Sequence, residues 1–124
     1  MALYALQMNT STTIHHMKLT TIVYPEKEAY YNKVLLSETN AKTTTTLGTV
    51  FLKKGTRIPN KGFSRHPFNE VSIIIEGCIE MLHEDNTVAG YLRKGIAVYI
   101  NALEPQAGNV LEDTKLIYVL NASE

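Results

Sequence analysis

Cysteine is nearly absent from this 124-residue sequence, whose only copy is Cys78. A single cysteine cannot form a disulfide within the chain, which excludes the cross-linked framework of many small secreted domains. Long hydrophobic runs are absent too, and no stretch approaches the ~18 apolar residues of a transmembrane helix. Polar residues at positions 9–13 interrupt the region where a secretory signal would have its apolar core. These absences predict a small soluble protein of the cytoplasm with no membrane partner.

Neither sign of charge is in excess, because 12 Lys and Arg residues balance 12 Asp and Glu residues. The two signs are mixed along the chain, which predicts no nucleic-acid partner and no affinity for an acidic membrane surface. The length is that of one domain and is sufficient for a real hydrophobic core.

The short apolar runs are rich in valine, isoleucine and threonine, and turn-forming residues separate them, which is typical of β-strands. Only residues 26–32 have a pattern compatible with a helical turn. The four threonines at 43–46 are expected to form an exposed strand. Many short strands in one domain predict a β-sandwich or barrel. The predicted strands are residues 18–24, 33–37, 43–53, 69–76, 79–82, 87–92, 97–100 and 115–120.

The first 17 residues form an N-terminal arm that precedes a single barrel domain of residues 18–124. The arm is too apolar for a freely solvated tail, since it contains Leu3, Tyr4, Leu6 and Met8. Two interpretations remain open. The arm packs on its own barrel, or it is a strand exchanged with a second subunit.

One motif stands out in the middle of the chain. The stretch GFSRHPFNEVSIIIEG, residues 62–77, places His66 four residues before Glu70 and ends at Gly77. It resembles the first motif of the cupin superfamily, in which two histidines separated by one residue precede a glutamate and a closing glycine. The position of the first of these histidines holds Ser64 in this chain.

A second stretch, residues 91–110, resembles the second cupin motif. The Glu-Pro dipeptide before Gln106 looks like the one found before the last metal-binding histidine of the family, and Tyr99 lies on the strand that leads to it. The resemblance covers roughly residues 45–120. It implies an all-β, cupin-type jelly-roll barrel of two antiparallel sheets. It also implies a homodimer, because small cupins commonly bury one sheet against a partner.

The family's metal site uses three imidazoles and one carboxylate, a set suited to Fe, Mn, Ni, Cu or Zn. This chain keeps His66 and Glu70 at the matching positions but has Ser64 and Gln106 at the other two. Hydroxyl and amide oxygens are weak replacements for imidazole nitrogens, so we expect no tightly bound metal and no required cofactor. The alternative is a labile divalent ion (Fe, Mn, Zn or Ni) held by His66, Glu70 and Gln106.

His66 and Glu70 are also candidates for a catalytic acid–base pair. On a strand, Glu70 and Ser72 share one face with Ile74, so the carboxylate would point into the barrel. His66 at the strand entrance could pair with it and support proton transfer next to a carbonyl. The competing interpretation is a purely structural hydrogen bond between the two side chains. The residues predicted to contact a ligand are Ser64, Phe68, Tyr99 and Gln106.

The sequence therefore predicts a small cupin barrel that binds a small organic molecule in its interior, with metal-independent acid–base chemistry as an option. Two alternatives remain open. One is a divergent metal-dependent cupin enzyme of the dioxygenase, isomerase or lyase type. The other is a non-catalytic sensor or partner domain that works through the outside of the barrel.

Overall fold

The computed structural model describes residues 12–14, 17–26 and 31–123. These residues contain strands and no helix, so none of them forms a helix that could span a membrane. The strands are β1 (Thr12–Ile14), β2 (Met17–Leu19), β3 (Asn32–Asn40), β4 (Thr43–Leu52), β5 (Arg57–Ile58), β6 (Asn69–Leu82), β7 (Val88–Arg93), β8 (Ala97–Ile100) and β9 (Gly108–Ser123).

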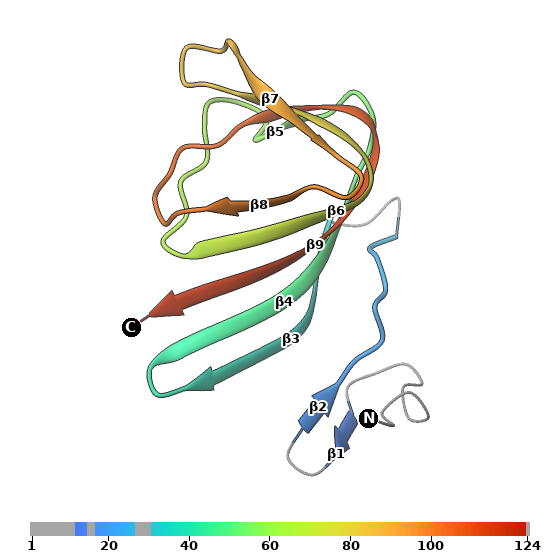
Figure 1. Cartoon of the computed structure of the whole chain (residues 1–124), viewed down its shortest axis with the longest axis vertical. Coiled ribbons are helices and arrows are strands. Elements are labelled where there is room, and N and C mark those ends of the chain that lie inside the picture. The colour runs from blue at the N-terminus through green and yellow to red at the C-terminus, as the bar shows by residue number, and fades with distance from the viewer. Residues whose placement is uncertain (1–11, 15–16, 27–30, 124) are drawn as a thin grey trace.

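Seven of these strands form one antiparallel sheet that folds over into two layers (Figure 1). The large layer contains β3, β4, the second half of β9, the first half of β6, and β8. The small layer contains β5, the first half of β9, the second half of β6, and β7. The fold class predicted from the sequence, an all-β jelly-roll barrel, is confirmed.

The fold-over occurs where β6 and β9 bend together. Gly77 has a φ of +103°, and its pairing with β9 is irregular from Ile74 to Ile79. A Cβ on Gly77 would overlap Thr114, whose side chain is fully buried and accepts a hydrogen bond from the Cys78 amide. The sequence predicted a strand end at this glycine. It is instead a β-bulge inside one long strand, and the extra residues bend the strand.

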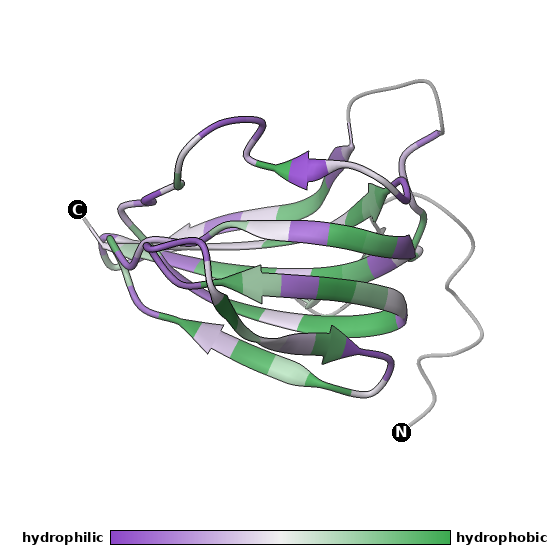
Figure 2. Cartoon of the chain, turned by 90° about the horizontal axis from the view of Figure 1, so that it is seen from above, coloured by the Kyte–Doolittle hydropathy of each residue, from purple (hydrophilic) through white to green (hydrophobic). Residues whose placement is uncertain are grey.

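The bulge also changes which side chains of β6 face inward. Before it, Ser72 and Ile74 are buried between the layers, whereas after it Ile79 and Met81 take the inward positions. Without the shift in register, the second half of the strand would turn its apolar side chains to solvent. Between the layers lies a core that contains Val50, Leu52, Ile74, Ile79, Val110, Leu116 and Tyr118. Figure 2 shows hydrophobic colour along the strands and hydrophilic colour in many of the connecting loops.

Most predicted strands lie within an observed one, and the differences have local causes. Residues 18–24 were expected to be a strand, but only β2 is regular there. The residues after β2 contact the large sheet through a hydrogen bond that the Thr49 hydroxyl donates to the Val23 carbonyl at 2.5 Å. The threonine run of β4 forms the predicted exposed strand. Its hydroxyls pair across to β3, with Thr39 and Thr44 2.8 Å apart.

Several predictions fall partly or wholly on residues outside those described. The N-terminal arm of residues 1–17 is described only at 12–14 and 17, where β1 pairs with β2, so its role stays a prediction. The helical turn expected at residues 26–32 includes 27–30, which are also outside the described part. Cys78 lies within the described residues. It is 2% exposed and has a free thiol, so it packs as a small buried side chain.

Candidate functional site

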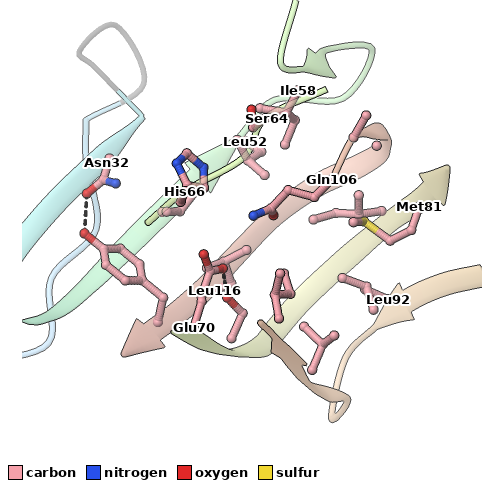
Figure 3. A pocket seen from close by; sticks show the side chains of 18 of the residues that line it. Asn32, Leu52, Ile58, Ser64, His66, Glu70, Met81, Leu92, Gln106 and Leu116 are labelled. Carbon is pink, nitrogen blue, oxygen red and sulfur yellow. Dashed lines mark hydrogen bonds between the residues drawn. The ribbon is translucent and has the colours of Figure 1, made fainter. Parts of the chain in front are cut away.

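A cavity of about 300 Å³ lies between the two layers (Figure 3). Its wall is mainly aliphatic, and β4, β5, β6, β7, β8 and β9 all contribute to it. The apolar wall residues include Val50, Leu52, Ile58, Ile79, Met81, Leu92, Val98, Ile100, Leu116 and Leu120. Such a wall with a few polar groups is typical of sites for small organic molecules.

Five of the six residues predicted to form the site line this cavity: Ser64, His66, Phe68, Glu70 and Gln106. They come from two segments about 40 positions apart in the sequence. Figure 3 shows the side chains of His66, Glu70 and Gln106 pointing toward one another across the cavity. The two cupin-like motifs therefore meet at one place in the fold.

Tyr99 is the exception, and its predicted place in the barrel interior is wrong. Its side chain is 57% exposed and does not line the cavity. Tyr99 pairs in register with Val71, which lies on the outward face of β6, while Val98 and Ile100 take the inward positions on β8. Tyr91 is also outside this cavity and is 45% exposed, whereas Tyr118 lines it.

The backbone holds the two motif segments together. Ser64 and Gln106 exchange two hydrogen bonds, each 2.9 Å, between their amides and carbonyls. Close by, the Leu103 amide donates to the His66 carbonyl at 2.7 Å. The two positions at which this chain departs from the cupin histidines are thus direct neighbours. Their side chains occupy the same end of the cavity.

Glu70 is held by its neighbour on the strand and not by His66. The Ser72 hydroxyl donates to Glu70 Oε2 at 2.6 Å, because residues two apart on a strand share a face. No side chain in the described part of the protein donates to Glu70 Oε1. The hydrogen bond expected between His66 and Glu70 is absent among the described residues, so that expectation is wrong.

His66 makes a ring contact in place of that hydrogen bond. Its imidazole stacks on Phe68 with the ring centroids 5.0 Å apart and an angle of 5° between the planes. Within the described residues, neither imidazole nitrogen has a hydrogen-bond partner, and the same is true of the Ser64 hydroxyl and of the side-chain amide of Gln106. The polar end of the cavity thus offers several donors and acceptors that a bound molecule can use.

Sequence reasoning missed a polar contact at another part of the wall. The Tyr118 hydroxyl donates to Asn32 Oδ1 at 2.6 Å, and both residues line the cavity (Figure 3). The contact crosses β4 at Gly48, where a Cβ would overlap the tyrosine ring. The signal was present, since a glycine inside a strand often marks a close approach by another group.

An arginine shapes the loop that carries Ser64. The Arg57 guanidinium donates to the carbonyls of Pro59 and Gly62, each at 2.9 Å, and lies 5.7 Å from the centre of the Phe63 ring. The Arg57 guanidinium therefore interacts with groups of its own loop and does not line the cavity. Arg65 is exposed and pairs with Glu84 at 3.1 Å.

The donor set does not fit a transition-metal site of the cupin kind. Among the described residues, no three His, Cys, Asp or Glu side chains gather in a group that could hold a metal ion. His66 and Glu70 are present, but Ser64 and Gln106 bring oxygens where the family has imidazoles. Divalent transition metals bind such a set far more weakly than one with three nitrogens.

Comparisons with solved structures find many of the same architecture. An RmlC-like cupin protein from Desulfovibrio desulfuricans aligns with a TM-score of 0.57 at 12% identity, over 88% of this chain and 95% of that chain. The cupin-2 domain of an XRE family transcriptional regulator from Enterobacter cloacae aligns with a TM-score of 0.56 at 17% identity, over 72% of this chain and 92% of that one.

An enzyme is also among the similar structures. The DMSP lyase DddQ from Ruegeria pomeroyi aligns with a TM-score of 0.57 at 21% identity, over 75% of this chain and 46% of that chain. No protein-family model and no curated protein matches the sequence. At these identities the likeness shows the fold, and the chain has the cupin fold. That fold is shared by enzymes and by domains of regulators.

Proposed function

We propose that the protein binds a small organic molecule in the cavity between its two layers. The observation that carries the proposal is the convergence of Ser64, His66, Glu70 and Gln106 on a mainly aliphatic cavity, with polar atoms that have no partner among the described residues. Polar side chains on an inward strand face are costly unless something satisfies them. A ligand or water in the cavity supplies those partners, and a ligand adds apolar contact with the wall.

The same residues can support acid–base chemistry on the bound molecule. Ser72 fixes the Glu70 carboxylate through Oε2, which leaves Oε1 to accept a proton or a hydrogen bond from the ligand. His66, held by its stacking on Phe68, can donate or accept a proton from a different side of the cavity. Gln106 and Ser64 would orient the ligand between them.

This function requires no tightly held metal. The proposal rests on the donor set, in which oxygens replace two of the family's nitrogens. Protein purified without a histidine tag should carry metal well below one ion per chain by elemental analysis. Stoichiometric metal that is lost on His66→Ala would overturn the proposal and favour the metal-dependent enzyme.

Ligand-induced thermal stabilisation tests the binding proposal directly. In a screen of small organic molecules, a ligand at about 100 times its dissociation constant should raise Tm by roughly 10 °C. Glu70→Gln and His66→Ala should each remove most of that rise. Glu112→Gln is the matched control, because Glu112 is exposed on β9 and does not line the cavity. Binding unchanged by both cavity variants would refute the proposed site.

We further propose that the protein is a homodimer joined through the outer face of the large layer. Two apolar pairs, Ile73 with Ile117 and Val71 with Val119, lie side by side on that face. Ile73 and Ile75 are 40% and 38% exposed in the single chain. An outer sheet face is ordinarily polar.

A second copy of the chain is the occupant that suits this face. The patch is bordered by the Lys115–Glu76 ion pair, and the chain has no formal net charge, so two copies meet without like-charge repulsion. Light scattering after gel filtration should give a dimer at micromolar concentration. Ile73→Lys should give a monomer with the parent's circular dichroism spectrum, whereas a monomeric parent would reject the proposal.

A further inference from the structure

The charged groups of the cavity wall are distributed unevenly. Glu70 is the only acidic residue among the described lining residues, and none of those residues is a lysine or an arginine. The nearest arginines in sequence are engaged elsewhere. Arg57 binds the carbonyls of its own loop, and Arg65 pairs with Glu84 on the surface.

No positive charge in the described structure neutralises the Glu70 carboxylate. His66, the one basic side chain on the wall, forms no ion pair with it and stacks on Phe68 instead. The Ser72 hydroxyl is a neutral donor and satisfies one oxygen only. A lone carboxylate beside aliphatic walls favours a positively charged ligand and repels an anion, because the apolar surroundings screen charge poorly.

We propose that the cavity selects a small organic cation with alkyl substituents, such as an alkylammonium or a sulfonium compound. The inference rests on the proposed binding function and specifies its ligand class. The cationic centre would lie beside Glu70 Oε1, near Phe68, which stacks on His66 and whose ring face attracts cations. The alkyl groups would contact the aliphatic wall, which a polyhydroxylated ligand could not match with hydrogen bonds.

The size of the cavity limits the ligand. A volume of about 300 Å³ corresponds to roughly ten water molecules at about 30 Å³ each. The cavity therefore has room for a molecule of about ten non-hydrogen atoms. Nucleotides and hexose phosphates are larger, and all phosphate esters carry the disfavoured negative charge.

Three probes of nearly equal shape separate charge from size. Choline carries a quaternary ammonium group, 3,3-dimethylbutan-1-ol is its neutral carbon isostere, and 3,3-dimethylbutanoate is an anion of similar size. Isothermal titration calorimetry on the full chain at low salt should give choline a dissociation constant at least about tenfold below that of the alcohol. The anion should be the weakest of the three ligands.

Variants of the full chain assign the preference to one residue. Glu70→Gln keeps the shape of the side chain but removes its charge, so it should weaken choline binding more than alcohol binding and bring the ratio between the two below about twofold. Glu112→Gln removes an exposed carboxylate outside the cavity and should keep the parent ratio.

The outcomes distinguish this inference from the proposed function. Equal binding of choline and the alcohol by the parent would overturn the cation preference and leave the binding function intact. Tighter binding of the anion, or failure of choline, tetramethylammonium and butylammonium all to bind, would also overturn it. The binding function itself fails only if the wider thermal screen finds no ligand sensitive to the cavity variants.

Discussion

In the first half of β6, the distribution of polar and apolar side chains between the inner and outer faces is the reverse of the usual one. Toward the interior, the strand presents Glu70 and Ser72 before its buried apolar residues begin at Ile74. Toward the outside, it presents Val71, Ile73 and Ile75, which are partly exposed. In an ordinary antiparallel sheet the polar side chains face water and the apolar ones face the core.

Among the described residues, packing within the chain leaves both faces of β6 incompletely covered. The interior face carries polar groups whose hydrogen-bonding capacity is only partly used. The outer face carries apolar groups whose contact area is only partly covered. Our two proposals, a ligand inside and a second copy outside, assign a partner to each face.

Gly77→Ala should have the largest effect, because it disrupts the bend in β6 that separates the inner face of the sheet from the outer one. The residue has a φ of +103°, and the new methyl group would overlap the backbone of Thr114. Strain and overlap together should lower the free energy of unfolding by about 4 kcal/mol or more. Urea denaturation measures the loss. Gly90→Ala is the control, because no atom lies within 4 Å of the added Cβ, and an equal loss there would contradict the prediction.

Substitution of two adjacent isoleucines compares how much each face of β6 contributes to stability. Ile74 is 1% exposed and Ile73 is 40% exposed. Ile74→Ala should cost about 3 kcal/mol of unfolding free energy through lost burial and a new cavity. Ile73→Ala should cost about 1 kcal/mol or less when the protein is diluted to a monomer, as measured by urea denaturation. Equal losses at the two positions would show that the outer face is packed as tightly as the inner.

Tyr118→Phe tests the hydrogen bond that ties β9 to β3 across the cavity wall. The hydroxyl donates to Asn32 Oδ1, and its removal should cost about 1 kcal/mol of unfolding free energy. Tyr91→Phe removes a hydroxyl from an exposed ring and should change stability by only a few tenths of a kcal/mol. Gly48→Ala should cost more than Tyr118→Phe, because the added methyl group overlaps the buried ring and must displace it as well as break the hydrogen bond.

The smallest expected effect is a pH dependence on the outer face. Burial raises the pKa of the Tyr24 phenol, although nearby Lys115 opposes the shift. The raised pKa means that the contribution of Tyr24 to stability is complete below about pH 10, the unfolded value, and is lost as pH rises through the folded value. Urea midpoints between pH 8 and 11 should therefore fall more steeply for the parent than for Tyr24→Phe. The exposed Tyr99→Phe should behave like the parent.

Sequence reasoning predicted much of the fold and of the site. The spacing from His66 through Glu70 to Gly77, together with the second motif, led to the barrel and to five of the residues that line its cavity. The alternation of Glu70, Ser72 and Ile74 on the inward face of β6 was also predicted correctly, because side-chain direction on a strand follows a period of two. These features depend on local sequence alone.

The errors concern features that depend on distant partners. Tyr99 faces outward because β8 pairs it with Val71, and a register between strands cannot be read from either strand alone. Gly77 was interpreted as a strand end because local propensity cannot distinguish a turn from a bulge that β9 continues to pair with. Strand β6 begins at Asn69, so His66 lies outside the strand and its side chain does not follow the alternation of β6. Ser72 is on the strand, two residues from Glu70 and on the same face, and it donates the hydrogen bond.

The sharing of β6 and β9 between both layers has a consequence for how the protein unfolds. Each strand runs through the bend, so neither layer can lose its central strands while the other stays intact. The two layers should therefore melt as one cooperative unit, with coincident transitions for different spectroscopic probes. Amide hydrogens on either side of Gly77 should exchange only through global opening, and those of the edge strands β7 and β8 through local opening. The bend at Gly77 separates the two layers in space, but the strands that pass through it make the unfolding of one layer depend on the unfolding of the other.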